Sequence, residues 1–193
     1  MKNFIIFGAP GAGKGTQAKL LAEKYSLAHL SSGEILRREI KSGELGEEIK
    51  KYLAAGRLVP TKIINLIMEK EIKRHKKARG FIFDGFPRTV GQAKRLDKVL
   101  EKEGRPINAV FKIRITEEEG IRRIMERGKT SGRIDDNRKV IKNRFKVYYR
   151  QIHPIIAYYQ KQKKMIIVDG HGPVKQIFKE ITGSIKEIVK QDK

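Results

Sequence analysis

Apolar residues follow two patterns along the chain, one typical of buried strands and one typical of helices. Five short apolar runs, bounded by polar or glycine-containing segments, have the length of strands inside a sheet. They cover residues 4–7, 27–30, 81–83, 109–115 and 165–168. The segments between them carry apolar residues at helical spacing, so strands alternate with helices. This alternation predicts a three-layer α/β fold, with a five-stranded parallel sheet covered on both faces and ligands at the carboxyl ends of its strands.

A glycine-rich segment follows the first predicted strand. Residues 8–16 read GAPGAGKGT, and a helical pattern begins at Thr16. Such a loop can wrap a polyphosphate, because its backbone N–H groups and the helix dipole favour an anion and Lys14 adds a positive charge. The spacing G-x-x-x-x-G-K is that of a phosphate-binding loop, although Gly15 stands where a hydroxyl residue usually follows the lysine. We therefore expect a fold of the P-loop NTPase type that binds a nucleoside triphosphate.

The connection between the second and third predicted strands is longer than a simple crossover requires. Ser31 and Glu34 have the spacing of a capping box and predict the start of a helix, which Gly43 and Gly46 end. Two further helices are predicted in this connection, over residues 47–55 and 61–74. We expect this helical excursion to bind a second substrate.

The third predicted strand ends in a carboxylate. In proteins with a phosphate loop, an aspartate placed like Asp84 faces the loop and holds magnesium directly or through water. The alternative is that Asp84 is a loop residue or a helix cap. The next four residues, 85–88, read GFPR, where glycine allows close approach of a ligand, proline stiffens the loop and arginine can bind a phosphate through two N–H groups. Gln92 offers an amide to the edge of a base.

Arginines gather around a polar segment near residue 130. A helix is predicted over 117–126 and ends at Arg127-Gly128, and the loop 129–137 follows. Four arginines flank or occupy this region, namely Arg123, Arg127, Arg133 and Arg144. A mobile loop with arginines over a phosphate site suits phosphoryl transfer, because it neutralises charge and excludes water. The alternative for Asp135 and Asp136 in the same loop is that they only cap the next helix.

The chain is strongly basic, with a formal net charge of +22 from 44 Lys and Arg against 22 Asp and Glu. This charge is typical of nucleic-acid-binding proteins, but the lysines lie in scattered pairs and no basic and aromatic RNA-binding motif is present. A cationic surface that attracts anionic nucleotides is the favoured interpretation. The absence of cysteine excludes disulfides and cysteine-ligated zinc. No apolar run approaches the ~20 residues of a membrane span or the ~7–15 of a signal-peptide core, so we expect a cytoplasmic protein without a membrane partner.

Four segments, GAPGAGKGT, SSGEILR, DGFPRTVGQA and RGKTSGRIDDN, together resemble the adenylate kinase family in its short-lid form without a zinc-binding insert. The resemblance covers essentially the whole chain. It implies a single nucleoside monophosphate kinase domain over 1–193, with a core (1–30, 61–126 and 138–193), an AMP-binding insertion (31–60) and a short lid (127–137). It also implies reversible phosphoryl transfer from MgATP to AMP giving two ADP, Mg²⁺ as cofactor, and a monomer without an obligate protein partner.

The resemblance further implies roles for individual residues. Those that bind ATP are Gly11, Ala12, Gly13, Lys14, Gly15, Thr16, Arg127 and Gly172. Those that bind AMP are Ser32, Arg37, Arg57, Leu58, Val59, Gly85, Phe86, Pro87, Arg88, Gln92, Arg133 and Arg144. The catalytic residues are Lys14, Arg88, Arg123, Arg127, Arg133 and Arg144, together with Asp135 and Asp136, which help the lid to close. Asp84 organises Mg²⁺, through water. Within the family Gly15 occupies its usual place, and Ser32 replaces the more frequent threonine but keeps the hydroxyl.

Two other functions remain open. A UMP or CMP kinase would share the fold, but Gln92 and the hydroxyl of Ser32 resemble the adenine-binding pattern, whereas the pyrimidine relatives tend to have alanine and asparagine there. A basic nucleic-acid-binding ATPase would leave the segment DGFPRT unexplained. Transfer to AMP also fits the scarcity of bases, because a phosphate oxygen is already ionised near neutral pH and the motifs contain no convincing general base.

Overall fold

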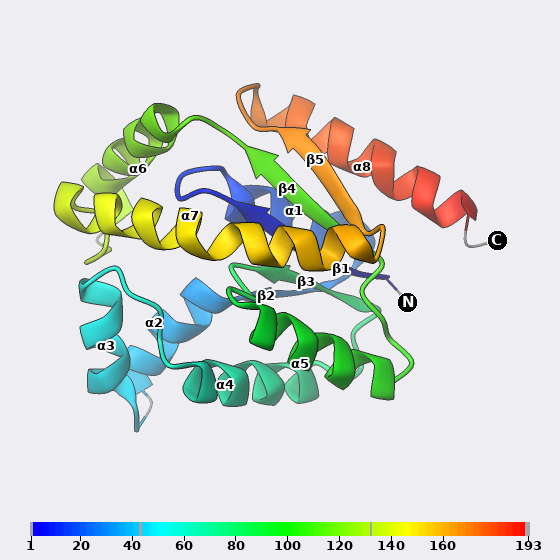
Figure 1. Cartoon of the computed structure of the whole chain (residues 1–193), viewed down its shortest axis with the longest axis horizontal. Helices are drawn as coiled ribbons and strands as arrows, with labels where there is room; N and C mark the ends of the chain where they lie inside the picture. The colour runs from blue at the N-terminus through cyan, green and yellow to red at the C-terminus, as the bar shows by residue number, and fades with distance from the viewer. Residues whose placement is uncertain (1, 43, 132, 192–193) are drawn as a thin grey trace.

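A parallel sheet of five strands lies at the centre of the computed structural model, which describes residues 2–42, 44–131 and 133–191 (Figure 1). The strands are β1 (Lys2–Gly8), β2 (Ala28–Ser31), β3 (Gly80–Asp84), β4 (Ala109–Arg114) and β5 (Met165–Asp169). Their order across the sheet is β2-β3-β1-β4-β5, and every neighbouring pair is parallel. The five predicted strands and their parallel arrangement are therefore confirmed.

Helices cover both faces of the sheet. They are α1 (Lys14–Tyr25), α2 (Ser32–Ser42), α3 (Gly46–Ala54), α4 (Thr61–Arg74), α5 (Val90–Lys102), α6 (Glu117–Ser131), α7 (Arg138–Lys161) and α8 (Val174–Gln191). Alternate residues of β1 separate the two cores: Ile5 and Phe7 pack with α4, α5 and the second half of α7, whereas Phe4 and Ile6 pack with α1 and α8. The three-layer fold is thus the one predicted. No helix in the described part of the chain is long and apolar enough to cross a bilayer.

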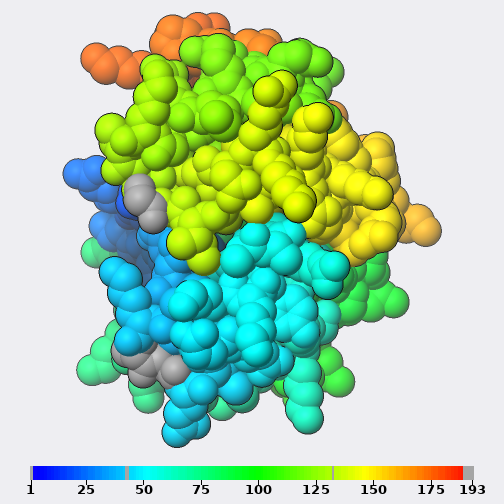
Figure 2. Space-filling view, turned by 90° about the vertical axis from the view of Figure 1, so that its left-hand side faces the viewer, coloured from blue at the N-terminus to red at the C-terminus, as the bar shows by residue number. Residues whose placement is uncertain are grey.

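The helical excursion between β2 and β3 lies at the carboxyl ends of the strands. α2 begins at Ser32, and the hydroxyl of Ser31 accepts a hydrogen bond from the backbone of Glu34 at 3.5 Å, so the predicted helix start is confirmed. Gly43, expected to help end this helix, lies outside the described residues. Figure 2 shows α3 in contact with the α6–α7 region over this end of the molecule. The side-chain amide of Asn143 in α7 donates to the carbonyl oxygen of Ala55 at 2.6 Å, which ties the excursion to α7.

The end of α6 differs from the prediction. The helix does not stop at residue 126 but continues through Arg127 and Gly128 to Ser131. A Cβ atom on Gly128 would lie 3.1 Å from the carbonyl oxygen of Asp136, so this glycine accommodates the returning chain and does not break the helix. The predicted loop of 129–137 is therefore shorter, and its Gly132 lies outside the described residues.

The N-cap of α7 bears on the alternative role of Asp135 and Asp136. Asn137 occupies the cap position, and its side chain accepts a hydrogen bond from the backbone of Val140 at 3.0 Å. Asp135 and Asp136 therefore do not cap this helix. Their carboxylates are free to bind the arginines around them, as described below.

Candidate active site

An open cleft of about 800 Å³ lies at the carboxyl ends of the strands, between α2 and α3 on one side and α6 and α7 on the other. Its volume is that of a site for a small organic ligand, ~300–1,000 Å³. All the site residues suggested by the sequence line this cleft except Pro87, which lines a smaller adjoining cavity, and Asp136, which is hydrogen-bonded to the lining residue Arg127. The fold thus brings together segments that are more than a hundred residues apart in the chain.

The phosphate loop forms the floor of the cleft. Gly11 and Gly13 have φ angles of 82° and 81°, in the left-handed region that favours glycine. Gly13 also precedes α1 without a side-chain cap, so the first N–H groups of the helix are available to an anion. The ammonium group of Lys14 donates to the carbonyl oxygens of Gly8 and Ala9, at 2.8 Å each, and is held beneath the loop. This arrangement suits the binding of a polyphosphate.

Burial and neighbouring positive charges make the charge of Lys14 costly. Burial lowers the pKa of Lys14 to about 8; Asp84 opposes this change, and Arg88 and Arg144 add to it. Burial and the charge of Arg144 also lower the pKa of Arg88. A bound phosphate would relieve this repulsion, so the cleft favours polyanionic ligands.

Asp84 ends β3 beside the phosphate loop, 3.4 Å from the position a Cβ atom of Gly15 would take. Its partner in register on β2 is Ser31, whose hydroxyl donates to the carboxylate at 3.2 Å. Nε2 of His29 lies 3.7 Å from the same carboxylate oxygen. Burial alone would raise the pKa of Asp84, but His29, Lys14 and Ser31 together hold it below its usual value. Asp84 is therefore ionised at neutral pH.

The sequence analysis missed His29. The relevant pattern was the strand period of two: His29 and Ser31 lie on the same face of β2, so once Ser31 faces Asp84 the imidazole must do so as well. Gln17 was missed because its partner is distant in the sequence. Its amide donates to the carbonyl oxygen of Val174 at 3.0 Å and joins the start of α1 to the start of α8, a contact between segments 157 residues apart.

The donor set around Asp84 suits magnesium more than a transition metal. Mg²⁺ prefers oxygen ligands, keeps several waters and is commonly held by one or two carboxylates together with substrate phosphates. Within residues 2–42, 44–131 and 133–191, no three His, Cys, Asp or Glu side chains are grouped so that they could hold an ion alone. A carboxylate next to a phosphate loop therefore fits an ion that arrives with its nucleotide.

The segment after β3 is rigidly held. Gly85, with a φ of 73°, accepts hydrogen bonds at its carbonyl oxygen from the hydroxyl of Ser32 at 2.8 Å and from Nε of Arg88 at 2.6 Å. Gln92 is buried, and its Oε1 accepts from the backbone of Arg88 at 2.6 Å, which leaves its NH₂ group as a donor.

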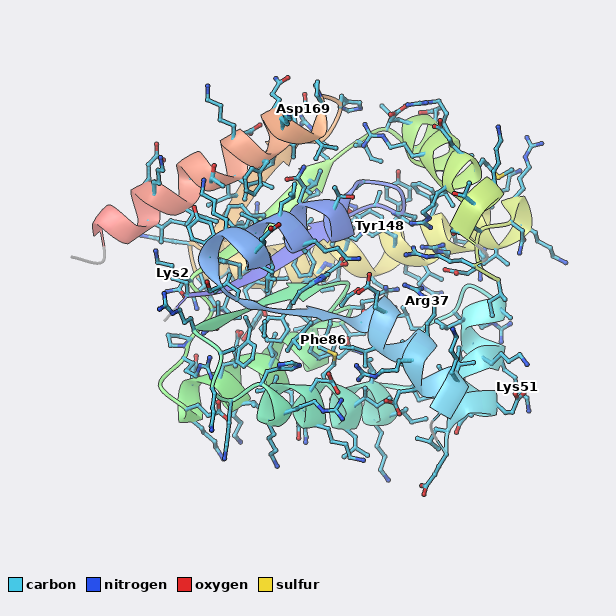
Figure 3. The ribbon with its side chains drawn as sticks, turned by 180° about the vertical axis from the view of Figure 1, so that it is seen from behind. Lys2, Arg37, Lys51, Phe86, Tyr148 and Asp169 are labelled. Atoms are coloured by element: carbon cyan, nitrogen blue, oxygen red, sulfur yellow. The ribbon has the colours of Figure 1, made fainter. Side chains whose placement is uncertain are left out.

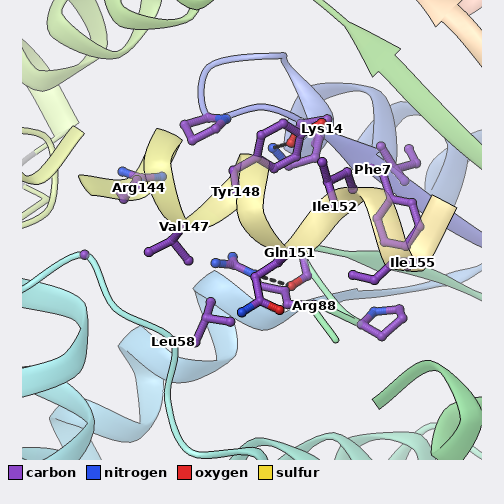
Figure 4. Close-up of a pocket in the computed structure, with 16 residues that line it drawn as sticks. Phe7, Lys14, Leu58, Arg88, Arg144, Val147, Tyr148, Gln151, Ile152 and Ile155 are labelled. Carbon is purple, nitrogen blue, oxygen red and sulfur yellow. Dashed lines mark hydrogen bonds between the residues drawn. The ribbon is translucent and has the colours of Figure 1, made fainter. Parts of the chain in front are cut away.

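Figure 4 shows Lys14, Arg88 and Arg144 around a smaller cavity of about 90 Å³ against α7. These three cations converge from three different elements.

Two aspartates hold the arginines of α6 and α7. Arg127 donates two hydrogen bonds to Asp136, at 2.9 and 2.6 Å, and Ser131 donates a third at 2.9 Å. These bonds outweigh the effect of burial and hold the pKa of Asp136 below its usual value. Arg144 pairs with Asp135 at 2.8 Å. The two carboxylates thus fix the guanidinium groups at the rim of the cleft.

Other arginines in the cleft have no such partner. Among the described residues, the guanidinium groups of Arg37, Arg57 and Arg133 form no hydrogen bond or ion pair. Burial and the positive charge of Arg133 lower the pKa of Arg37, so these two residues, from opposite sides of the cleft, are close enough to repel each other. Arg37 is carried by α2 (Figure 3). An anion between them would bind both.

A phosphate loop, a carboxylate facing it, and arginines on both sides of one cleft define an enzyme of the nucleoside monophosphate kinase class. The family model described as adenylate kinase matches residues 6–164. The chain is 45% identical over 190 residues to the adenylate kinase of Parabacteroides distasonis, covering 98% of both chains. It is 41% identical over 189 residues to that of Bacteroides thetaiotaomicron and 42% identical over 190 residues to that of Flavobacterium johnsoniae, covering 97% of this chain and 100% of each relative. The chain belongs to the adenylate kinase family.

The lowered pKa of Lys14 predicts a pH-dependent affinity for ATP. Lys14 is protonated and attracts phosphate below a pH of about 8, and it loses its charge as the pH rises through that value. The dissociation constant should therefore rise by up to about tenfold per pH unit above the pKa. Isothermal titration calorimetry between pH 7 and 9.5 measures it. A Lys14→Gln variant is the control for titration of ATP itself. It should bind ATP weakly, and its dissociation constant should not rise in the same way with pH. An equally steep rise in this variant would contradict the role of Lys14.

Proposed function

We propose that the chain transfers the γ-phosphoryl group of MgATP to AMP, reversibly, and gives two ADP. The observation that carries this proposal is the convergence of cations from both sides of one cleft onto the end of the phosphate loop. Lys14 comes from the loop, Arg88 from the segment after β3 and Arg144 from α7. Such a set serves two phosphate chains that meet end to end. The names of the similar proteins support AMP as the acceptor.

We assign the donor nucleotide to the phosphate-loop side. The backbone from Gly11 to Thr16 and the ammonium group of Lys14 would bind the triphosphate. Arg127 would cover the triphosphate, and Arg123 would line the same part of the cleft. The backbone of Gly172 would lie beside the adenine. Arg123 is held ready for this by bonds to Glu119 at 2.6 Å and to the carbonyl oxygen of Gly170 at 3.0 Å.

We assign the acceptor to the side of α2 and the segment after β3. Arg37 and Arg88 would bind the phosphate of AMP, and the free NH₂ group of Gln92 would donate to the base. The remaining acceptor residues are Ser32, Arg57, Leu58, Val59, Gly85, Phe86 and Pro87. Arg133 and Arg144 would contact both phosphate chains. The bonds of Ser32 and Gln92 to the segment after β3 support an acceptor pocket whose wall is held in place by the protein itself.

The transfer needs no general base. A phosphate oxygen of AMP is ionised near neutral pH, so its lone pair forms the new bond to the γ-phosphorus while the bond to the bridging oxygen of the leaving ADP breaks. Charge spreads over the oxygens of the transferred group, and Lys14, Arg88 and Arg144 are positioned to neutralise it. A single arginine at such a place is worth ~10³–10⁵ in rate. The protein therefore contributes alignment and positive charge.

Asp84 would hold Mg²⁺ through water. When bound, the ion neutralises charge on the β- and γ-phosphates and fixes their orientation. This role is supported by the position of the ionised carboxylate beside the phosphate loop. One of its oxygens lies 3.4 Å from the point that a Cβ atom at position 15 would occupy.

We propose that residues 31–60 act as the AMP-binding insertion and residues 127–137 as a short lid on a core formed by the rest of the single domain. The lid would begin inside α6, since the helix extends to Ser131. Asp135 and Asp136 would help it close by holding Arg144 and Arg127. Closure over both nucleotides would exclude water and so prevent hydrolysis of ATP.

We further propose that the protein works as a cytoplasmic monomer without an obligate partner, and that its charge of +22 attracts nucleotides and not nucleic acid. A cleft with excess positive charge raises the rate of encounter with anionic substrates, and it does so less as salt rises.

The acceptor specificity tests this proposal. ADP formation from MgATP is measured with AMP, UMP, CMP or GMP as sole acceptor and with no acceptor. We expect kcat/KM for AMP to exceed that for the others by about 10²-fold or more, because a base that leaves the buried Gln92 unpaired is penalised. Turnover on UMP or CMP would transfer the function to a pyrimidine kinase, and phosphate release without an acceptor would favour an ATPase.

Arg88→Ala should separate chemistry from donor binding. We expect kcat to fall by about 10³-fold or more, because the acceptor phosphate and the transferred group lose a cation. The dissociation constant for ATP should change less than about threefold, measured by calorimetry without AMP. Arg150→Ala, at an exposed position of α7 without an ion-pair partner among the described residues, is the matched control and should keep the wild-type rate. An unchanged kcat in Arg88→Ala would remove this residue from the acceptor site.

A further inference from the structure

Gly120, in the first turn of α6, packs with its backbone directly against the phosphate loop. A Cβ atom on Gly120 would lie 2.6 Å from the carbonyl oxygen of Pro10 and 2.6 Å from Cζ of Phe145. Conversely, a Cβ atom on Gly11 would lie 2.4 Å from the carbonyl oxygen of Gly120. Real Cβ atoms do not approach other atoms this closely, so neither position accepts a side chain without displacement of one backbone.

The contact is particular to this glycine. Gly11 belongs to the phosphate loop and has a positive φ, but Gly120 lies in a regular helix and in none of the motifs of the sequence. A glycine inside a helix costs about 1 kcal/mol relative to alanine. Gly183, inside α8, shows the contrast, because a Cβ atom there would meet nothing within 4 Å. The close approach to the loop gives a physical reason for glycine at position 120 only.

α6 connects this contact to the arginines over the cleft. Arg123 and Arg127 follow Gly120 by three and seven residues and lie on the same face of the helix. Both line the cleft, and Figure 1 shows α6 on the side of the sheet where the phosphate loop ends. A change in the distance between α6 and the loop at Gly120 would therefore move the part of the helix that carries both arginines.

We infer that Gly120 is a positioning residue for phosphoryl transfer, an inference that rests on the function proposed above. By letting α6 and the loop touch, it places Arg123 and Arg127 over the bound triphosphate. A methyl group at this position must displace α6 or the loop, because its contact with the backbone of Pro10 would be 2.6 Å, well inside the ordinary van der Waals range of 3.4–4 Å. Displacements of about 1 Å at a reacting centre cost about 10²-fold in rate.

Gly120→Ala is the test variant, and Gly183→Ala is its matched control, since each adds one methyl group to a helical glycine. We expect kcat of Gly120→Ala to fall by about 10- to 100-fold, while KM for ATP and AMP changes less than about threefold. Gly183→Ala should keep the wild-type rate. A Gly120→Ala enzyme as fast as the control would overturn the inference, and a loss confined to KM would do the same.

A double-mutant comparison distinguishes positioning from a general structural defect. In an enzyme that carries Arg123→Ala and Arg127→Ala, the further change Gly120→Ala should alter kcat by less than about threefold, because the groups it positions are absent. A full additional loss in this background would show that Gly120 does not act through the arginines.

Phe145→Leu provides a second background for the test, in case Gly120→Ala alone does not fold. This change removes the ring contact at 2.6 Å but leaves the contact with Pro10. The pair Gly120→Ala/Phe145→Leu should therefore fold, with a kcat about tenfold or more below that of Phe145→Leu alone; equal rates would overturn the inference.

A wild-type enzyme without ATP:AMP transfer would instead refute the proposed function, whereas an active wild type with an equally active Gly120→Ala would refute only the role of Gly120.

Discussion

Repulsion between like charges is the constraint on which this structure depends. The cleft gathers Lys14, Arg88 and Arg144 at the end of the phosphate loop, and burial together with mutual repulsion lowers the pKa of both Lys14 and Arg88. Asp84 offsets part of this cost on the floor of the cleft, and Asp135 does so at the rim. The remaining imbalance favours polyanions. A site built in this way gains most when two phosphate chains enter it together.

The fold keeps these charges together by fixing each on a rigid element. Lys14 is bound to backbone carbonyl oxygens, Arg88 to the carbonyl oxygen of Gly85, and Arg127 to Asp136. The backbone contact at Gly120 then fixes α6 against the phosphate loop. Because these supports come from the protein's own backbone and side chains, little reorganisation remains for the moment of transfer, which is the condition for strong electrostatic catalysis.

Local patterns in the sequence were sufficient for most of the fold and much of the cleft. The apolar runs gave the five strands, α4 has the predicted bounds of 61–74, and the glycine and DGFPR segments lie at strand ends, where the chemistry was expected. Errors arose where a distant contact decides the outcome. Gly128 was interpreted as a helix end, but it lies inside α6, where the backbone of Asp136 packs against it. The alternative that Asp135 and Asp136 only cap α7 is excluded by the packed structure, in which Asn137 is the cap. His29, Gln17 and Gly120 were missed, because only the packed structure reveals their partners.

A crystal structure with AMP and a non-hydrolysable ATP analogue bound together tests the central claim most directly. The account predicts that the two phosphate chains meet between Lys14, Arg88 and Arg144, with the analogue on the phosphate loop and the phosphate of AMP on Arg88. A second nucleotide bound outside this cleft, or an AMP phosphate that contacts none of these three cations, would contradict it.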